Sequence, residues 1–257
     1  MTDARPTAGH RRLALVTGAG SGIGRATAIR LADDGYALAL VDLDESALAA
    51  TVELVGEHVA ISVALDIRDV EGVDRLFRRI GSLDQPLWLL ANVAGVGVRK
   101  DSASTSDEEW AHVLSINLTG TFVMCRAALP QLIAAGGGVI VNVASVAGLV
   151  GIRERAAYCA SKAGVIGLTR AIAVDHSGEG VRATALCPGT VDTEWIGRIL
   201  GGAEDPAAAR ALMAARQLDG RLGAPEEVAA GIAFLASDDG RFVNGAAWVM
   251  DGGMSAA

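Results

Sequence analysis

Short apolar runs, of the kind found in buried strands, recur along the chain and alternate with helical patterns. They cover residues 13–17, 37–41, 60–65, 87–91, 138–143 and 181–186. Strands this apolar are buried on both faces, which predicts a parallel sheet with helices on both sides. Right-handed crossovers between the strands then favour a doubly wound α/β topology. A last short run at 246–250 is expected to complete the sheet.

The regular rhythm indicates a single domain over residues 1–257, without internal repeats or a linker. One stretch, at about 190–220, breaks the spacing with Gly201, Gly202 and Pro206, and we interpret it as a helical lid over the substrate. In open α/β sheets, ligands bind beyond the carboxyl ends of the strands. Residues that directly follow each strand are therefore the candidates for a functional site.

Charge and hydropathy narrow the class of partner. The net charge of −8 removes the electrostatic attraction to nucleic acid or anionic lipid, so we expect a small-molecule partner, no nucleic acid and no membrane. Residues 1–12 lack the apolar core of a secretory signal, which favours a cytoplasmic protein. The three cysteines and four histidines are scattered without metal-ligand spacing, so we predict no metal site.

A glycine-rich segment follows the first predicted strand and reads T-G-A-G-S-G-I-G over residues 17–24. It misses the generic G-x-G-x-x-G spacing and has no Walker lysine. Glycines at these positions allow a tight turn and a close approach of the backbone to a pyrophosphate at a helix N-terminus. The alternative is a loop that merely joins strand to helix. The predicted cofactor contacts in this turn are Gly18, Ser21, Gly22, Ile23 and Gly24.

Polar and small residues follow the next three strands. Asp42 is placed to accept hydrogen bonds from the adenosine ribose and to repel the 2′-phosphate of NADP, which predicts NAD as the cofactor. Asp42 is also suited to cap the helix that starts near residue 44, and the two roles are compatible. We expect the residues after the third and fourth strands to flank the adenine or pass beneath the cofactor: Asp66, Ile67, Asn92, Ala94 and Gly95.

Tyr158 and Lys162 lie four residues apart in a predicted helix, so the phenol and the ammonium share one face. A tyrosine has an ordinary pKa of ~10, and to act as a base near neutral pH it needs its phenolate stabilised by ~3 to 4 kcal/mol. Lys162 and an oxidised nicotinamide would supply the positive charge. Taken alone, the pair is weak evidence, because a Tyr and a Lys on an ordinary helix surface explain the spacing better.

The glycine turn, N-x-A-G at 92–95, Ser145 thirteen residues before the tyrosine, and Y-x-x-x-K together resemble the short-chain dehydrogenase/reductase family over residues 17–253. The resemblance implies a Rossmann fold in which Tyr158 is the catalytic acid or base and Ser145 holds the reacting oxygen. It implies that Lys162 binds the nicotinamide ribose and lowers the pKa of Tyr158. Asn117 matches the family residue that helps to hold a water in the proton relay.

The same resemblance extends to the loop at 188–193, where Pro188 and Gly189 belong to the nicotinamide-binding loop. There the backbone of Val191 would meet the carboxamide and Thr193 the pyrophosphate. Two features differ among relatives: Val93 stands where many have a second asparagine, and Ser21 stands where NADP-preferring members carry a basic residue. The serine and Asp42 both favour NAD.

These observations predict an oxidoreductase that transfers a hydride between NAD and a secondary alcohol or ketone. Three arginines, Arg155, Arg198 and Arg216, suggest a hydroxy acid, sugar or sugar acid, because guanidinium binds carboxylates in a bidentate fork. Surface arginines paired with Glu154, Glu194 or Asp219 are the alternative. Family members are commonly homotetramers, which we expect here as well. Two other functions compete with this one. The first is a non-catalytic NAD sensor or scaffold, and the second is a methyltransferase, which would not need the Tyr–Lys pair.

Overall fold

The computed structural model describes residues 11–256, so residues 1–12, expected to carry no secretory signal, lie largely outside the described residues. Its centre is a seven-stranded parallel sheet in the order β3-β2-β1-β4-β5-β6-β7. The order reverses between β1 and β4, as in a doubly wound sheet, and confirms the predicted fold. The strands are β1 Leu13–Thr17, β2 Ala37–Asp42, β3 Val59–Ala64, β4 Leu87–Asn92, β5 Gly138–Val143, β6 Val181–Pro188 and β7 Ala247–Met250.

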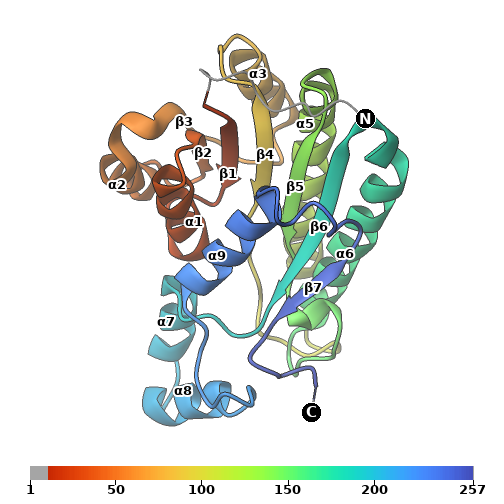
Figure 1. The fold of residues 1–257 in the computed structure, drawn as a ribbon. Helices are drawn as coiled ribbons and strands as arrows, with labels where there is room; N and C mark the ends of the chain where they lie inside the picture. The colour runs from red at the N-terminus through yellow and green to blue at the C-terminus, as the bar shows by residue number, and fades with distance from the viewer. Residues whose placement is uncertain (1–10, 257) are drawn as a thin grey trace.

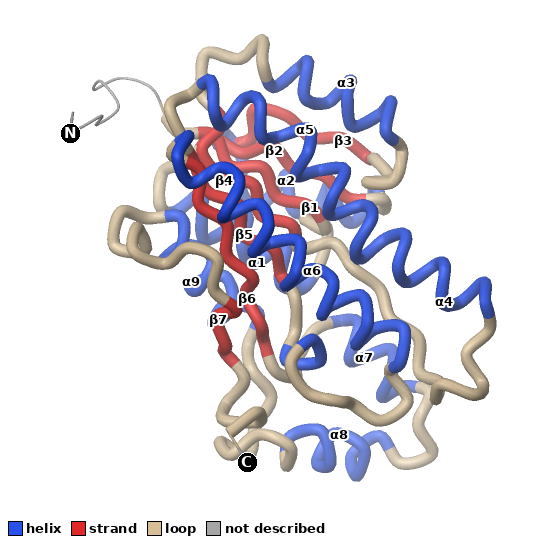
Figure 2. Tube along the Cα trace, turned by 90° about the vertical axis from the view of Figure 1, so that its right-hand side faces the viewer, coloured by secondary structure: helices blue, strands red, loops and turns tan. Residues whose placement is uncertain are grey.

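Helices cover both faces of this sheet (Figures 1 and 2). Because successive strand residues point to opposite sides, Leu13 and Leu15 enter one apolar core while Ala14 and Val16 enter the other. One face is covered by α1 Gly22–Asp33, α2 Glu45–Val55 and α9 Pro225–Ala236. The other carries α3 Val70–Ile80, α4 Asp107–Leu114, α5 Thr121–Ala134 and α6 Ala156–His176.

The strand boundaries differ slightly from those predicted. β3 begins at Val59 and ends at Ala64, and as an edge strand it is largely exposed rather than buried on both faces. β6 continues two residues beyond the apolar run, to Pro188. This extension pairs with β7 and carries the chain past the end of β5, directly to the loop before the irregular stretch at 190–220.

The helical segment Asp107–Ala134 combines α4, a π-helical turn at Ser115–Gly120, and α5. It is long and apolar enough to span a membrane by length and composition. However, Met124 and Ala128 are fully buried in the core beneath the sheet, so this is a core helix of the fold.

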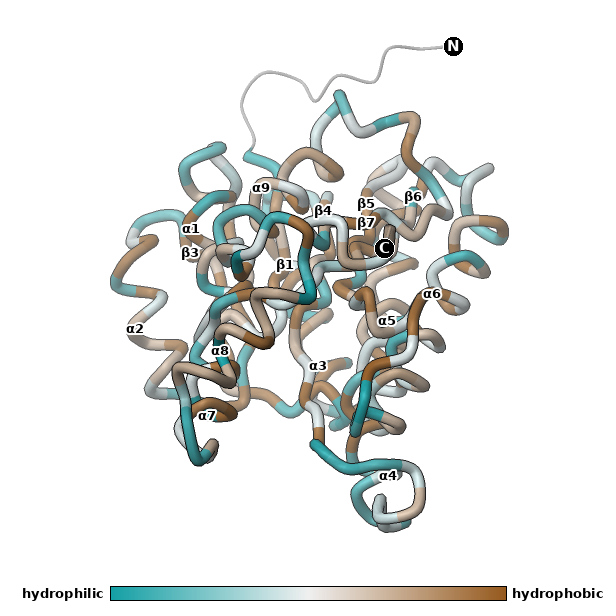
Figure 3. The backbone as a smooth tube through the Cα atoms, turned by 90° about the horizontal axis from the view of Figure 1, so that it is seen from below, coloured by the Kyte–Doolittle hydropathy of each residue, from teal (hydrophilic) through white to brown (hydrophobic). Residues whose placement is uncertain are grey.

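The irregular stretch at 190–220 forms two short helices, α7 Glu194–Gly201 and α8 Pro206–Ala214. Asp205 caps α8 by accepting a hydrogen bond from Ala208 N, and Pro206 begins the helix. The two helices contact each other beyond the carboxyl ends of the strands, below the sheet in Figure 1 and toward the viewer in Figure 3. This is where a helical lid was predicted.

Candidate active site

The glycine turn between β1 and α1 is folded tightly against the end of β2. Gly18 and Gly22 have φ of 67° and 47°, which L-residues with side chains rarely adopt. Asp42 accepts a hydrogen bond from Gly20 N at 2.8 Å and another from Asp44 N at 3.0 Å. Asp44 caps α2, so the helix-cap alternative for Asp42 does not hold. The carboxylate of Asp42 instead orders the turn.

This turn opens onto a cavity of about 1020 Å³, which we call the turn-side cavity. Its walls come from the segments that follow β1 to β4 and from the start of α7. Asp66 lies here in an ion pair with Arg68 at 2.6 Å, and the hydrogen bonds from Arg68 hold the pKa of Asp66 below its usual value. The predicted residues that line this cavity are Gly18, Ser21, Gly22, Ile23, Gly24, Asp42, Asp66, Ile67, Ala94, Gly95 and Thr193.

Asn92, which was predicted to contact the cofactor, lines neither this cavity nor the next. Its side chain is buried in the sheet, where Nδ2 donates to Oδ1 of Asn142 at 2.8 Å. Asn142 in turn donates to Oγ1 of Thr169 at 2.9 Å. These bonds link β4, β5 and α6 beneath the site, so Asn92 supports the scaffold and does not reach the cleft.

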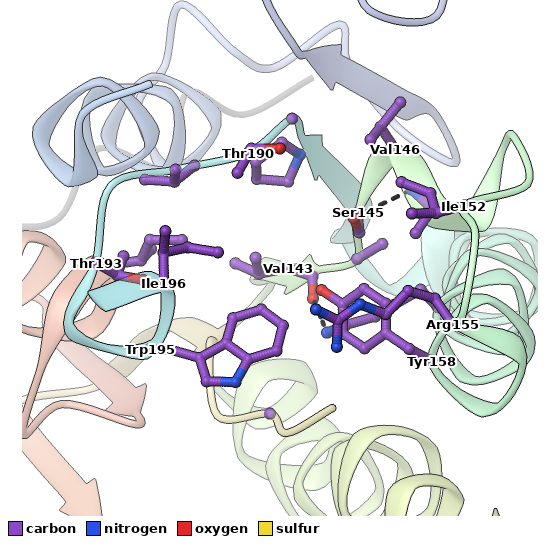
Figure 4. Close-up of a pocket in the computed structure, with 18 of the residues that line it drawn as sticks. Val143, Ser145, Val146, Ile152, Arg155, Tyr158, Thr190, Thr193, Trp195 and Ile196 are labelled. Atoms are coloured by element: carbon purple, nitrogen blue, oxygen red, sulfur yellow. Dashed lines mark hydrogen bonds between the residues drawn. The ribbon is translucent and has the colours of Figure 1, made fainter. Parts of the chain in front are cut away.

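Ser145, Tyr158 and Lys162 converge on a second cavity, of about 960 Å³, which we call the tyrosine-side cavity (Figure 4). Ser145 follows β5, whereas Tyr158 and Lys162 come from the first turns of α6. Lys162 Nζ donates to the carbonyl of Val143 at 2.8 Å, which anchors α6 to the end of β5. The nicotinamide-loop residues predicted from the sequence also line this cavity, namely Pro188, Gly189, Val191 and Thr193.

Burial dominates the electrostatics of this pair. It raises the pKa of Tyr158, while the hydrogen bond with Ser145 and the charge of Arg155 act in the opposite direction. Burial also lowers the pKa of Lys162 to about 8, a direction that the thiol of Cys187 only partly opposes. The protein groups alone therefore keep the phenol protonated at neutral pH, and further positive charge is needed to make it a base.

Asn117 lies in the π-helical turn and is fully buried. Its amide accepts from Val96 N and donates to Val96 O, both at 2.8 Å, and donates to Ser161 Oγ at 3.0 Å. A single side chain thus joins the loop after β4 to the helix of Tyr158. Ser161 was not singled out in the sequence, because a serine inside an amphipathic helix has no distinctive signal.

The three candidate arginines do not share one location. Arg155 and Arg216 line the tyrosine-side cavity, whereas Arg198 is exposed on α7 and does not line it. The acids proposed as surface partners are each paired with a different arginine: Glu154 with Arg99 at 2.6 Å, Glu194 with Arg25 at 3.8 Å, and Asp219 with Arg221 at 3.9 Å. Arg155 and Arg216 thus remain available to a ligand.

The remaining walls of the tyrosine-side cavity are apolar and escaped the sequence analysis. They are contributed by the loop after β5 and by the segment of α7 and α8, at Val146, Ile152, Trp195, Ile196 and Met213. In a sequence, apolar residues that line a cavity from short helices and loops look the same as apolar residues that pack into the core. Trp195 is the one aromatic residue between residues 190 and 220, which is the signal that could have drawn attention to it.

Residues 18–255 match the family model described as Enoyl-(Acyl carrier protein) reductase. The chain is 44% identical over 252 residues to cis-4-hydroxycyclohexanecarboxylate dehydrogenase of Sinomonas cyclohexanicum, which covers 95% of this chain and 97% of the relative. It is 38% identical over 247 residues to 2-(S)-hydroxypropyl-CoM dehydrogenase 3 of Xanthobacter autotrophicus, with 94% and 95% covered. The chain belongs to the short-chain dehydrogenase/reductase family.

The structure agrees with this assignment. A crystal structure assigned to the short-chain dehydrogenases/reductases, from Burkholderia xenovorans, superposes with a TM-score of 0.92 at 34% identity and covers 96% of this chain and 98% of that one. The predicted family and oxidoreductase class are thereby confirmed, over the non-catalytic alternative. Short-chain dehydrogenases/reductases typically use a nicotinamide cofactor, and the glycine cradle together with the open turn-side cavity fits one.

Proposed function

We propose that this protein is an NAD-dependent dehydrogenase that interconverts a secondary alcohol and a ketone, with Tyr158 as the acid or base. The observation that carries the proposal is the convergence of Ser145, Tyr158 and Lys162 on one cavity that adjoins the turn-side cavity. The two cavities share Thr193 and Gly95, so one extended ligand can occupy both. The dehydrogenases among the relatives support the same reaction class.

A bound nicotinamide would supply the hydride acceptor or donor. In the oxidising direction, Tyr158 takes the hydroxyl proton of the alcohol, and in the reducing direction it returns a proton to the ketone oxygen. The Ser145 hydroxyl orients that oxygen. Lys162 would hold the nicotinamide ribose, and its charge favours the phenolate. Asn117 is joined through Ser161 to the backbone carbonyl of Tyr158, and in this proposal it helps to hold the relay water.

We assign the cofactor as NAD on the basis of Asp42. Its carboxylate stands at the wall of the turn-side cavity and is fixed by two backbone N–H groups. A negative charge held there favours ribose hydroxyls and repels the 2′-phosphate of NADP. Ser21 lines the same cavity and offers no positive charge to compensate. The cofactor contacts in this proposal are the lining residues named above together with Tyr158 and Lys162.

The substrate that fits best is a hydroxy acid with an apolar skeleton. Among residues 11–256, no aspartate or glutamate lines the tyrosine-side cavity, whereas Arg155, Arg216 and Lys162 do. Guanidinium groups bind a carboxylate through two parallel hydrogen bonds. The name of the Sinomonas relative, whose substrate is a hydroxy acid with a ring, agrees with this class. Sugar acids satisfy the charge but leave the apolar walls poorly matched.

We further propose a cytoplasmic homotetramer. The exposed apolar residues Val249 on β7 and Phe242 before it support an interface along the free edge of the sheet. Size-exclusion chromatography with light scattering tests the assembly, since a monomeric mass would contradict it.

NADH absorbance with a panel of secondary alcohols, hydroxy acids and sugar acids tests the activity. We expect NAD-dependent turnover in the wild type and a loss of about 10²- to 10⁴-fold in kcat for Tyr158→Phe, which removes only the hydroxyl. Tyr36→Phe, at the other tyrosine of the chain and far from both cavities, is the matched control and should retain activity. Equal turnover by wild type and Tyr158→Phe would reject the mechanism.

A further inference from the structure

Trp195 occupies the junction of the two cavities and lines both of them. It is the second residue of α7, directly after the helix begins at Glu194. Its ring lies beside that of Tyr158, with 5.8 Å between ring centroids and 40° between ring planes. In Figure 4 the indole projects from the lid into the space in front of Tyr158 and Arg155. Trp195 is therefore the lid residue whose ring packs against the ring of Tyr158.

The indole rests on bare backbone at Gly97, which lines neither cavity. A Cβ on Gly97 would lie 2.9 Å from Cζ2 of Trp195 and 3.2 Å from Cδ2 of Tyr158. Both distances are shorter than ordinary van der Waals contact, so any side chain at 97 would displace one of the two rings. The missing side chain lets the indole and the phenol rest on the same loop, and this contact fixes the position of the indole.

Arg155 is held between this loop and the indole. Its Nη1 donates to the carbonyl of Val98 at 3.1 Å, and its guanidinium carbon is 5.5 Å from the centroid of the Trp195 ring. The latter is a cation–π distance. Glu154, the residue before it, has φ of 57° and accepts a hydrogen bond from Lys100 N at 2.9 Å. The strained backbone at Glu154 turns Arg155 into the cavity, where the indole limits its freedom.

We propose that Trp195 is the specificity-determining residue of the substrate pocket. Its indole is the wall that limits the width of the carbon skeleton next to Tyr158, and it keeps Arg155 directed at the carboxylate of the substrate. This inference rests on the proposed function, which it deepens. With Ile152 and Met213 forming other apolar walls, the pocket accepts hydroxy acids with a slender or flat skeleton and rejects those branched beside the carbinol carbon.

The test compares two hydroxy acids that differ only in bulk beside the carbinol carbon, at saturating NAD. The measured quantity is the ratio of kcat/KM for the bulky acid to that for the slender acid. Both values come from the same enzyme preparation, so losses of folded protein cancel in the ratio. We expect Trp195→Ala to raise the ratio about ten-fold or more, a change typical of one enlarged apolar pocket, and Trp195→Phe to raise it less.

Leu212→Ala is the matched control, because Leu212 lies on the lid, is 69% exposed and lines neither cavity. Its ratio should equal that of the wild type. A second readout compares the slender acid with its primary amide, and Trp195→Ala should reduce the preference for the acid by loosening Arg155.

The two proposals fail in distinguishable ways. If the wild type is active but the size ratio does not change in Trp195→Ala, the inference about Trp195 is wrong and the proposed function stands. If the size ratio rises but the preference for the acid does not fall, the part of the inference that concerns Arg155 is wrong. If the wild type oxidises no secondary alcohol with NAD, the proposed function itself fails.

Discussion

The turn-side and tyrosine-side cavities are adjoining parts of one cleft, yet they are built and charged differently. Asp42, Asp66 and Glu194 line the turn-side cavity, with Arg68 paired to one of them. The tyrosine-side cavity carries Lys162, Arg155 and Arg216 and, among residues 11–256, no carboxylate. The acidic end suits the hydroxyl-rich adenosine, whereas the basic end suits an anionic substrate and a phenolate.

The two cavities also differ in how their functional residues affect the stability of the fold. The turn-side end depends on glycines whose replacement would disturb the backbone itself. The tyrosine-side end contains Lys162, a buried cation whose lowered pKa shows that the folded protein disfavours its charge. At the turn-side end, the glycines that bind the cofactor also stabilise the fold. At the tyrosine-side end, Lys162 serves catalysis but destabilises the fold. The following predictions test this difference, beginning with the largest effect.

The largest effect is expected at Lys162. Lys162→Met should lower kcat about 10³-fold, because the charge that favours the phenolate of Tyr158 is lost. The cofactor-free variant should nevertheless be more stable than the wild type at pH 7. The folded pKa of about 8 is lower than the unfolded value of 10.5, so the unfolded wild type binds the proton more tightly and wild-type stability rises with pH between these values.

Urea denaturation from pH 7 to pH 10 measures this. The stability advantage of Lys162→Met should shrink as the pH rises above about 8. An advantage independent of pH would mean that the buried charge does not destabilise the fold.

The next largest effect is expected in the glycine turn. A Cβ at residue 24 would collide with the carbonyl of Gly18, so Gly24→Ala should cost about 3 kcal/mol in the free energy of unfolding and abolish NAD binding by calorimetry. Gly167→Ala is the control, since nothing lies within 4 Å of its Cβ position on the exposed side of α6. It should stabilise the protein by about 0.5 to 1 kcal/mol. A similar loss of stability in Gly24→Ala and Gly167→Ala would show that the glycine at residue 24 has no special role in the turn.

A smaller effect is expected at the basic end. Arg155→Gln and Arg216→Gln should each raise KM for a hydroxy acid about 10- to 100-fold, the value of a hydrogen bond to a charged group. KM for an uncharged secondary alcohol should stay the same. Arg198→Gln is the control on the exposed face of α7. Unchanged KM for the acid in the first two variants would reject a carboxylate substrate.

The smallest effect is expected at Asp42. Asp42→Ser should improve kcat/KM for NADP relative to NAD by about ten-fold, since the repelling charge is removed but no positive charge replaces it. Steady-state kinetics with both cofactors measures the change. A wild type that prefers NADP would overturn the assignment of the cofactor.

The sequence locates residues that follow strands more readily than residues on loops and short helices, for a physical reason. Residues 17–24 and Asp42 lie at strand ends, where the chain order alone determines which edge of a parallel sheet they share. Arg155, Arg216 and Trp195 come from loops and lid helices, whose relative placement depends on tertiary contacts such as that at Gly97. The sequence could therefore propose three arginines but could not separate Arg198 from the others.

Asn92 illustrates a different limit. It ends β4 beside the cleft, as the motif predicts, but its side chain points into the sheet toward Asn142. A residue at a strand end has two faces to choose from, and a pattern of small residues does not determine which one. The π-helical turn around Asn117 was equally invisible, because its residues have ordinary helical propensities.

The contact between Gly97 and Trp195 constrains the order in which substrate preference can evolve. A smaller residue at 195 is tolerated whatever stands at 97, because a smaller side chain leaves the loop after β4 undisturbed. A larger residue at 97 is tolerated only after Trp195 has been replaced by a smaller residue, since a side chain at 97 and the indole cannot both fit. Descendants of a chain like this one should therefore carry a side chain at 97 only together with a smaller residue at 195. The intermediate, with glycine at 97 and a small residue at 195, would have a wide pocket and a broad specificity.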